Sequence, residues 1–205
     1  MKPDNKFFSF MSFLGDIILL NLLFIITSIP VVTAGTSATA LYAAIKKRIH
    51  GRESYVMRDY FSLWKSNFKN SFIIWIILLP CILLMLLFTS YIARHLFNLT
   101  ALIIYFIAFV LLAFITAYIF PLQATFVNTP LRLIRNSLLT AFAHFPYTLL
   151  LIFAVSVPVC ITLCFPAAFY YTCAYWLLLG FSVTAIISAA VTEKVFRHYI
   201  PEQKN

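Results

Sequence analysis

The chain has 205 residues, of which 63% are hydrophobic and only 10% are charged. A soluble domain averages about 25% charged residues, and a water-soluble fold of this size cannot hide so much apolar surface. The net charge of +9 does not indicate nucleic-acid binding, because the basic residues occupy short segments between apolar stretches and form no continuous patch. The composition therefore predicts an all-α, polytopic bundle of transmembrane helices in a lipid bilayer.

Near the N-terminus, an aromatic-rich lead-in precedes a first expected span over residues 16–30, which Pro30 ends or kinks. A second apolar stretch, residues 35–48, is short and ends in the basic cluster Lys46–Arg48. It forms either a short or tilted second span or a re-entrant half-helix. Basic residues favour the cytoplasmic side, so an even number of crossings must separate Lys2 and Lys6 from that cluster. A hairpin of two spans that turns near Pro30–Gly35 satisfies this condition, and so does a re-entrant pair formed by the first two segments.

Residues 54–68 are polar but carry aromatic and aliphatic side chains at helical spacing. This pattern predicts an amphipathic helix that lies on the inner membrane surface. Its exposed side either binds anionic lipid or docks a membrane or cytoplasmic partner. The residues expected to contact a partner are Arg58, Phe61, Trp64, Lys65, Asn67, Phe68 and Lys69.

Long stretches without charge indicate the remaining spans. No Asp, Glu, Lys or Arg lies between Lys69 and Arg94 or between Arg94 and Arg132, and each gap accommodates one helix of about 20 residues. The gap from Arg135 to Glu193 accommodates two. We expect spans over residues 70–91, 99–127, 140–165 and 172–191.

Six crossings place every Lys and Arg except Arg94 on the cytoplasmic side. Both termini are then cytoplasmic, including the tail that contains Lys204. A possible internal repeat accompanies this topology: Lys69–Phe72 resembles Arg135–Leu138, and Pro80 matches Pro146 at the same offset. The similarity arises either from duplication of a helical hairpin or from coincidence.

Several polar and small residues near the first two spans are candidates for helix packing or a ligand site. Asp16 is expected to cap the start of the first span, and Asn21 is expected to face another helix. The small residues from Thr33 to Ala40 allow either close helix packing or an unwound, ligand-binding stretch. The candidate positions are Asp16, Asn21, Pro30, Thr33, Gly35 and Thr36.

Nothing in the sequence indicates a catalytic, metal or cofactor site. The four histidines are scattered, and the four cysteines lie in apolar stretches, where we expect them to be buried and structural. No phosphate-binding glycine loop, G-x-S-x-G or H-E-x-x-H motif occurs. With six acidic residues, the chain offers little material for acid–base catalysis, so we expect that it is not an enzyme.

A set of segments, most of them in the first 75 residues, forms a combined motif: Phe13–Asp16, Asn21–Phe24, Ser28–Gly35, Ala38–Tyr42, Asp59–Phe61, Lys65–Asn70 and Arg135–Ser137. Through these segments the first 75 residues resemble the YesL family of bacterial membrane proteins. The resemblance implies a place in the bacterial cytoplasmic membrane and a link to carbohydrate uptake, because members of that family often accompany carbohydrate ABC importers. We therefore expect an accessory or regulatory subunit of oligosaccharide import that contacts the importer's permease and ATPase subunits; a stand-alone transporter or channel for small solutes is the alternative.

Overall fold

A computed structural model describes residues 6–51, 55–94, 99–126, 128–164 and 169–197, and these residues form helices without any strand. The predicted all-α class is confirmed. Lys2 and Lys204, which entered the topology argument, lie outside the described residues. In chain order the elements are α1 (Lys6–Ser28), the 3₁₀ turn η1 (Val31–Thr33), α2 (Ala34–Ile49), α3 (Val56–Arg94), α4 (Leu99–Thr125), α5 (Pro130–Ala143), α6 (Phe145–Cys164), α7 (Phe169–Tyr175), the π-helix η3 (Trp176–Gly180) and α8 (Phe181–Phe196).

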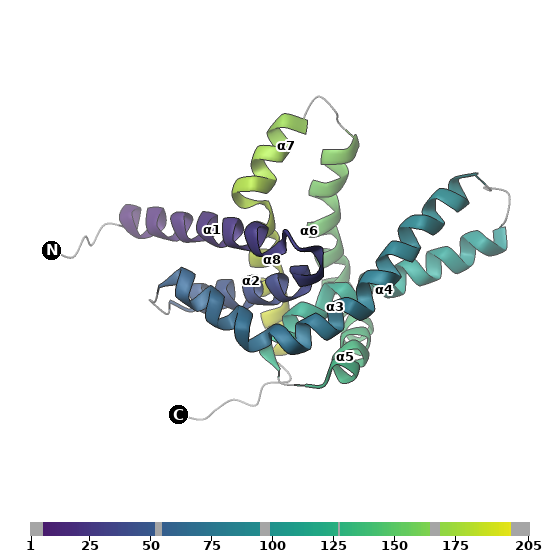
Figure 1. The fold of residues 1–205 in the computed structure, drawn as a ribbon, viewed down its shortest axis with the longest axis horizontal. Coiled ribbons are helices and arrows are strands. Elements are labelled where there is room, and N and C mark those ends of the chain that lie inside the picture. Colours follow the sequence, from purple (N-terminus) through teal and green to yellow (C-terminus); the bar gives the residue numbers. More distant parts are fainter. Residues whose placement is uncertain (1–5, 52–54, 95–98, 127, 165–168, 198–205) are drawn as a thin grey trace.

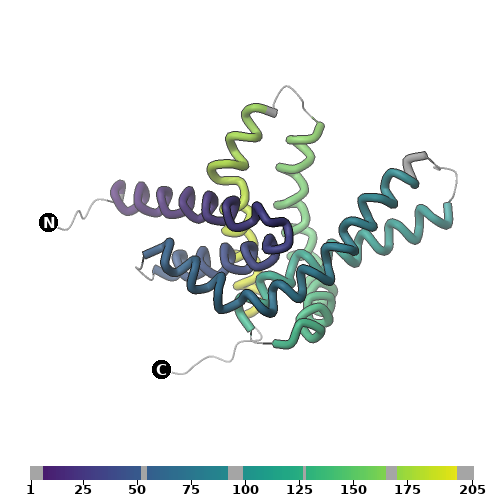
Figure 2. Tube along the Cα trace, in the orientation of Figure 1, coloured from purple at the N-terminus to yellow at the C-terminus, as the bar shows by residue number. Residues whose placement is uncertain are grey.

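Three segments run alongside one another at the N-terminal side of the molecule. Helices α1 and α2 form an antiparallel hairpin, and the first half of α3 packs against both of them (Figure 1). Two further hairpins, α3–α4 and α6–α7, point away from this layer in different directions, as the trace in Figure 2 shows. Helix α8 returns between them and contacts α1, α2, α4 and α6.

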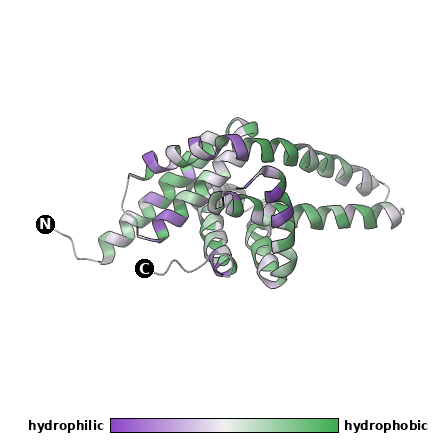
Figure 3. Ribbon diagram, turned by 90° about the horizontal axis from the view of Figure 1, so that it is seen from below, coloured by the Kyte–Doolittle hydropathy of each residue, from purple (hydrophilic) through white to green (hydrophobic). Residues whose placement is uncertain are grey.

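Within the described part of the chain, five helices are long and apolar enough to cross a membrane: Phe7–Ser28, Val56–Tyr91, Leu99–Thr125, Phe145–Cys164 and Tyr170–Phe196. The chain is thus a multi-pass membrane protein. Large apolar side chains such as Leu84, Leu87 and Phe106 are more than 60% exposed, which suits contact with lipid rather than water. In Figure 3, hydrophobic residues cover most of the α3–α4 hairpin, whereas hydrophilic residues gather on the side that carries the two chain ends and on α5.

The surface helix expected at residues 54–68 and the span expected at residues 70–91 are not separate elements: Val56–Arg94 is a single helix of 39 residues, α3. No Gly or Pro stands at their junction, and the proline of this helix, Pro80, lies well inside it. In the second half of the proposed repeat, α5 ends at Ala143 and α6 begins at Phe145, so Pro146 lies in a first helical turn. The two segments of the repeat therefore have different backbone paths.

The turn between α1 and α2 meets α3 near the middle of that long helix. The Trp75 indole Nε1 donates a hydrogen bond to the Val31 carbonyl, at 2.6 Å. Helix α3 continues beyond Trp75 for roughly 28 Å at 1.5 Å per residue, and that continuation is its most apolar part. With 16 residues, α2 is also shorter than the five long helices. This geometry favours the re-entrant alternative for residues 31–48; their depth in a bilayer stays a prediction.

Two apolar cores hold the helices together. The first core joins α1, α2 and the start of α3 around Leu20, Leu41 and Tyr60. The second core joins the four helices α3, α4, α5 and α6 around Phe114 and Leu133. Helix α8 contributes to both cores, with Ala189 in the first and with Val191, Val195 and Phe196 in the second. The space between the two cores is where the described chain leaves a cavity.

Candidate functional site

The exposed face of α3 carries a row of basic side chains. Arg58, Lys65 and Lys69 are spaced by seven and four residues, so they lie on one side of the helix, and all three are exposed. Phe61 lies on the same side and is 39% exposed. We call these four residues the basic stripe. Cationic groups around an exposed aromatic ring make a surface that an anionic or mixed polar and apolar partner can contact.

The opposite face of α3 is fixed to α1 and α2 by polar contacts. The Trp64 indole donates to the Ser37 hydroxyl at 3.3 Å, and the Tyr60 hydroxyl lies 2.7 Å from the Thr27 hydroxyl. Further along, Ser71 donates to Thr39 at 3.0 Å. Trp64, which the sequence suggested as a partner contact, is therefore partly buried and packs towards α2.

The other two predicted contact residues lie at the border of these faces. Asn67 donates to the Leu63 carbonyl of its own helix, at 2.9 Å. Phe68 is half-buried and packs between the rings of Trp64 and Phe72, with ring centroids 4.8 and 5.4 Å away. Of the seven predicted contact residues, Arg58, Phe61, Lys65 and Lys69 are thus the ones that remain available to a partner.

Two ion pairs join the basic end of α2 to its neighbours. Arg48 Nε lies 2.7 Å from Asp16 Oδ2, and Lys47 Nζ lies 2.7 Å from Asp59 Oδ2. The expected capping role of Asp16 is wrong, because α1 begins at Lys6 and Asp16 lies well inside it. The carboxylate is satisfied by a guanidinium on the adjacent helix instead, which also fixes the register between α1 and α2.

Asn21 lies against the π-helix η3 and is fully buried. Its Nδ2 donates to the carbonyls of Trp176 and Leu177, at 3.0 and 2.8 Å, and its Oδ1 accepts from the amide of Ser182 at 3.0 Å. A π-helix disturbs the regular i to i−4 ladder, and one side chain here satisfies three of the backbone groups beside that disturbance. Asn21 therefore packs against another helix, in the manner expected from its sequence position.

The small residues after η1 bring α2 unusually close to α3. A Cβ added at Gly35 would lie 2.6 Å from the Trp75 Cβ, so a larger side chain does not fit there. Thr33 donates to the carbonyls of Thr27 and Pro30, at 2.7 and 2.8 Å, and closes the turn. The segment is helical from Ala34, so its geometry matches the close-packing alternative rather than an unwound stretch.

Two residues in this region have different surroundings. Thr36 is fully buried, and its hydroxyl has no hydrogen-bond partner among the described residues. Pro30 is exposed at the start of η1. The turn thus presents Pro30 outwards while Thr36 faces the interior.

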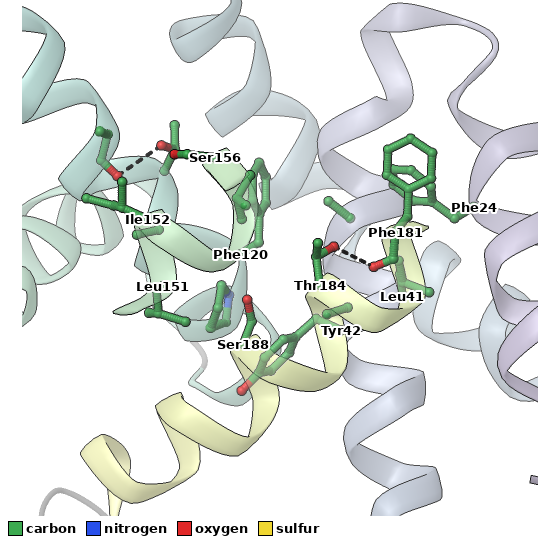
Figure 4. A pocket seen from close by; sticks show the side chains of 17 residues that line it. Phe24, Leu41, Tyr42, Phe120, Leu151, Ile152, Ser156, Phe181, Thr184 and Ser188 are labelled. Atoms are coloured by element: carbon green, nitrogen blue, oxygen red, sulfur yellow. Dashed lines mark hydrogen bonds between the residues drawn. The ribbon is translucent and has the colours of Figure 1, made fainter. Parts of the chain in front are cut away.

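A cavity of about 350 Å³ lies between α1, α2, α4, α6 and α8. Its wall is mainly apolar, with five hydroxyl-bearing residues interspersed, and Figure 4 shows Tyr42 and Ser188 on neighbouring helices beside it. Its volume lies within the ~300–1,000 Å³ typical of small-molecule sites. Sequence reasoning missed it because its wall comes from five separate segments and carries no motif. The lining residues used below are Tyr42, Phe120, Pro121, Ile152, Phe181 and Ser188.

The cysteines are not buried as the sequence suggested. All four, at positions 81, 160, 164 and 173, are unpaired and exposed. In a membrane protein apolar surface faces lipid, so residence in an apolar stretch does not require burial inside the protein. Among the described residues, no group of three or more His, Cys, Asp or Glu side chains is close enough to hold a metal ion.

Comparison with known proteins identifies a similarity over the N-terminal part of the chain. Residues 17–89 match a family described as "Protein of unknown function, DUF624". The matched segment contains most of α1, all of α2 and most of α3. No curated protein and no solved structure matches the chain.

Proposed function

We propose that this protein is an accessory or regulatory membrane subunit that docks a partner through the basic stripe of α3. The supporting observation is the division of α3 into two faces. Tyr60, Trp64 and Ser71 fix one face to α1 and α2, while the ion pairs of the described residues do not include the basic stripe on the other face. A rigidly held, exposed row of cations with one aromatic ring is suited to recognition.

The proposed partner is a carbohydrate ABC importer, through its permease or ATPase subunits. This part of the proposal rests on the resemblance of residues 1–75 to the YesL family, whose members accompany such importers. The importer would supply the substrate path and the ATP hydrolysis, so no catalytic role is proposed for this chain.

The side chains that line the cavity argue against the alternative of a stand-alone transporter when its solute is a sugar. None of its lining residues carries a charge or an amide group, and a sugar path needs many hydrogen-bonding side chains. Thr116 and Thr184 already donate to carbonyls of their own helices, at 2.9 and 2.8 Å. Few side-chain hydroxyl groups of the wall then remain to form hydrogen bonds with a solute that has many hydroxyl groups.

The test is purification of the C-terminally tagged chain from its native membrane under mild extraction. We expect permease and ATPase subunits in a fixed ratio to the tagged protein. Charge reversal at Arg58, Lys65 and Lys69 to Glu should remove them. Charge reversal at Arg132 and Arg135 on α5, which are also exposed, is the matched control and should leave the complex intact.

Two results would contradict the proposal. One is a tagged protein that purifies without importer subunits while the importer remains active in a strain that lacks this chain. The other is equal loss of partners in both charge-reversed variants, which would indicate nonspecific electrostatic binding rather than docking at the stripe.

A further inference from the structure

A polar cluster on three helices lies one helical turn beyond residues that line the cavity. On α2, α4 and α8, a residue that lines the cavity is followed four residues later by a polar residue, and this spacing places each pair on one helical face. The cluster therefore forms one end of the cavity. The lining residues are Tyr42, Pro121 and Ser188, and the residues one turn further along are Lys46, Thr125 and Thr192.

Hydrogen bonds connect these side chains across the three helices. The Tyr42 hydroxyl lies 2.5 Å from the Thr192 hydroxyl, and both residues are buried. The Lys46 ammonium donates to the Thr125 hydroxyl at 3.2 Å. We call Tyr42, Lys46, Thr125 and Thr192 the polar floor of the cavity.

Lys46 differs from the two basic residues that follow it. Lys47 and Arg48 each pair with a carboxylate at 2.7 Å, whereas the ion pairs of the described residues do not include Lys46, whose bonded partner is a neutral hydroxyl. The carboxylate of Glu193 attracts the Lys46 ammonium electrostatically but forms its ion pair with the His50 imidazole, at 3.2 Å. The half-buried Lys46 ammonium is therefore the cation of the polar floor that an anionic ligand can meet.

We propose that the cavity holds one acyl chain of an anionic phospholipid, whose phosphate binds Lys46 at the polar floor. The apolar wall, with Phe120 and Ile152, suits a hydrocarbon chain. Lys46 belongs to the basic end of α2, where charged residues gather, so the headgroup would lie at a polar level and the chain would extend into the apolar part of the bundle. This inference does not depend on the proposed partner of α3.

Two tryptophans provide an internal readout of occupancy. The Trp75 ring lies 6.2 Å from the Phe120 ring, and the Trp176 ring lies 5.0 Å from the Phe181 ring, and both phenylalanines line the cavity. Bromine atoms on an acyl chain quench tryptophan fluorescence at short range. A brominated chain in the cavity should therefore quench these two residues.

The experiment titrates the purified full chain, in a neutral detergent, with phosphatidylglycerol that carries brominated chains. Phosphatidylcholine with the same chains is the comparison, because it lacks net negative charge. We expect saturable quenching at one phosphatidylglycerol per chain and about tenfold weaker quenching by phosphatidylcholine, as loss of one charge-assisted contact predicts. Native mass spectrometry of the same samples counts the lipids bound.

Two pairs of variants locate the site. Ala185→Phe fills the cavity, whereas Ala190→Phe places the same ring on an exposed part of α8. Lys46→Gln removes the proposed phosphate contact, whereas Lys47→Gln removes the neighbouring charge that pairs with Asp59. We expect Ala185→Phe to abolish saturable quenching. We expect Lys46→Gln to weaken the binding of phosphatidylglycerol about tenfold, and the two control variants to bind it almost as the unaltered protein does.

Equal binding of the two lipids by the unaltered protein would overturn the proposal without any variant. So would saturation at several lipids per chain, because that indicates ordinary annular contact. If Ala185→Phe and Ala190→Phe lose saturable quenching equally, while circular dichroism shows unchanged helical content, the lipid binds outside the cavity.

Discussion

Helices α1, α2 and α3 are joined by polar side chains, whereas α4, α5 and α6 pack mainly through apolar ones. Within the first group, Tyr60, Trp64, Ser71 and Trp75 connect α3 by hydrogen bonds to α1, α2 and the turn between them. Two ion pairs add to these contacts. In the second group, Thr148 connects α6 to Tyr118 and to the Ala141 carbonyl, and the rest of the packing is mainly apolar.

This difference has a physical meaning in a bilayer. Lipid tails are as apolar as leucine, so burial of apolar side chains between membrane helices provides little net driving force. Close backbone approach and interhelical hydrogen bonds then specify the arrangement. The family match over residues 17–89 covers the group of helices in which these specific contacts are concentrated. We therefore expect α1–α3 to be the more precisely fixed part of the molecule, and four changes test that comparison.

The largest effect is expected at the α2–α3 contact. Gly35→Leu places a side chain where even a Cβ would lie 2.6 Å from the Trp75 Cβ. Overpacking of this kind typically costs about 1–3 kcal/mol, and a backbone-to-side-chain contact leaves little room to adjust, so we expect the upper end of that range. The measurement is the free energy of unfolding in detergent, followed by tryptophan fluorescence during titration with a denaturing detergent.

Gly15→Leu is the matched control on α1. No atom lies within 4 Å of a Cβ at Gly15, and leucine has a better helix propensity than glycine by about 0.8 kcal/mol. The control should therefore be neutral or slightly stabilising. Equal destabilisation by both substitutions would show that α2 and α3 are not held at this distance.

A somewhat smaller decrease in the free energy of unfolding is expected when Asn21 is replaced. Asn21→Leu keeps the side-chain size but leaves the carbonyls of Trp176 and Leu177 and the amide of Ser182 without their present partner. Unsatisfied buried groups cost about 1–3 kcal/mol each, partial rearrangement reduces the sum, and we expect about 2 kcal/mol. Unfolding by the same assay gives the value.

Asn67→Leu provides the comparison, because Asn67 bonds to the carbonyl of Leu63 in its own helix, and that carbonyl also belongs to the helical ladder. We expect a change below about 0.5 kcal/mol for this variant. If Asn21→Leu is equally mild, the π-helix does not depend on the α1 contact.

The ion pair between Asp16 and Arg48 should contribute less. Both side chains are half-buried, and pairs of this kind couple by about 1 kcal/mol or less. A double-mutant cycle with Asp16→Asn and Arg48→Gln measures the coupling, and added salt should reduce it. A parallel cycle that combines Asp16→Asn with Lys65→Gln should be additive, because Lys65 is exposed on another face. Coupling of the same size in both cycles would mean that long-range charge, rather than the contact, determines the effect.

The sequence predicted those features that depend on local chemistry. The small residues from Thr33 to Ala40 indicated close packing, and Asn21, an amide within an apolar span, indicated a helix partner; both contacts are present. The predicted role of Asp16 was wrong because the first span was expected to begin at this residue, although the aromatic residues before it are equally compatible with a helix.

Features that depend on tertiary arrangement could not be predicted from the sequence. Residues 54–68 have an amphipathic pattern and residues 70–91 an apolar one, and this change of pattern does not show that one helix continues through both environments. The cavity and its polar floor combine residues from helices more than 100 positions apart in the chain, such as Tyr42 and Thr192. A single sequence gives no information about which of the many apolar faces come together.

The smallest change in stability is expected for two serines at equivalent positions of the proposed repeat. Ser71 and Ser137 are both fully buried, yet Ser71 donates to Thr39 on another helix, at 3.0 Å, whereas Ser137 donates to the Leu133 carbonyl of its own helix, at 2.7 Å. Interhelical hydrogen bonds in membrane proteins average about 0.6 kcal/mol, so Ser71→Ala should lose about that amount. Ser137→Ala loses no contact between helices, and alanine is the better helix former, so its stability should be unchanged or slightly higher. If the two substitutions have equal effects in the unfolding assay, polar contacts between helices do not distinguish α1–α3 from α4–α6, and close packing around Gly35 alone must account for the difference.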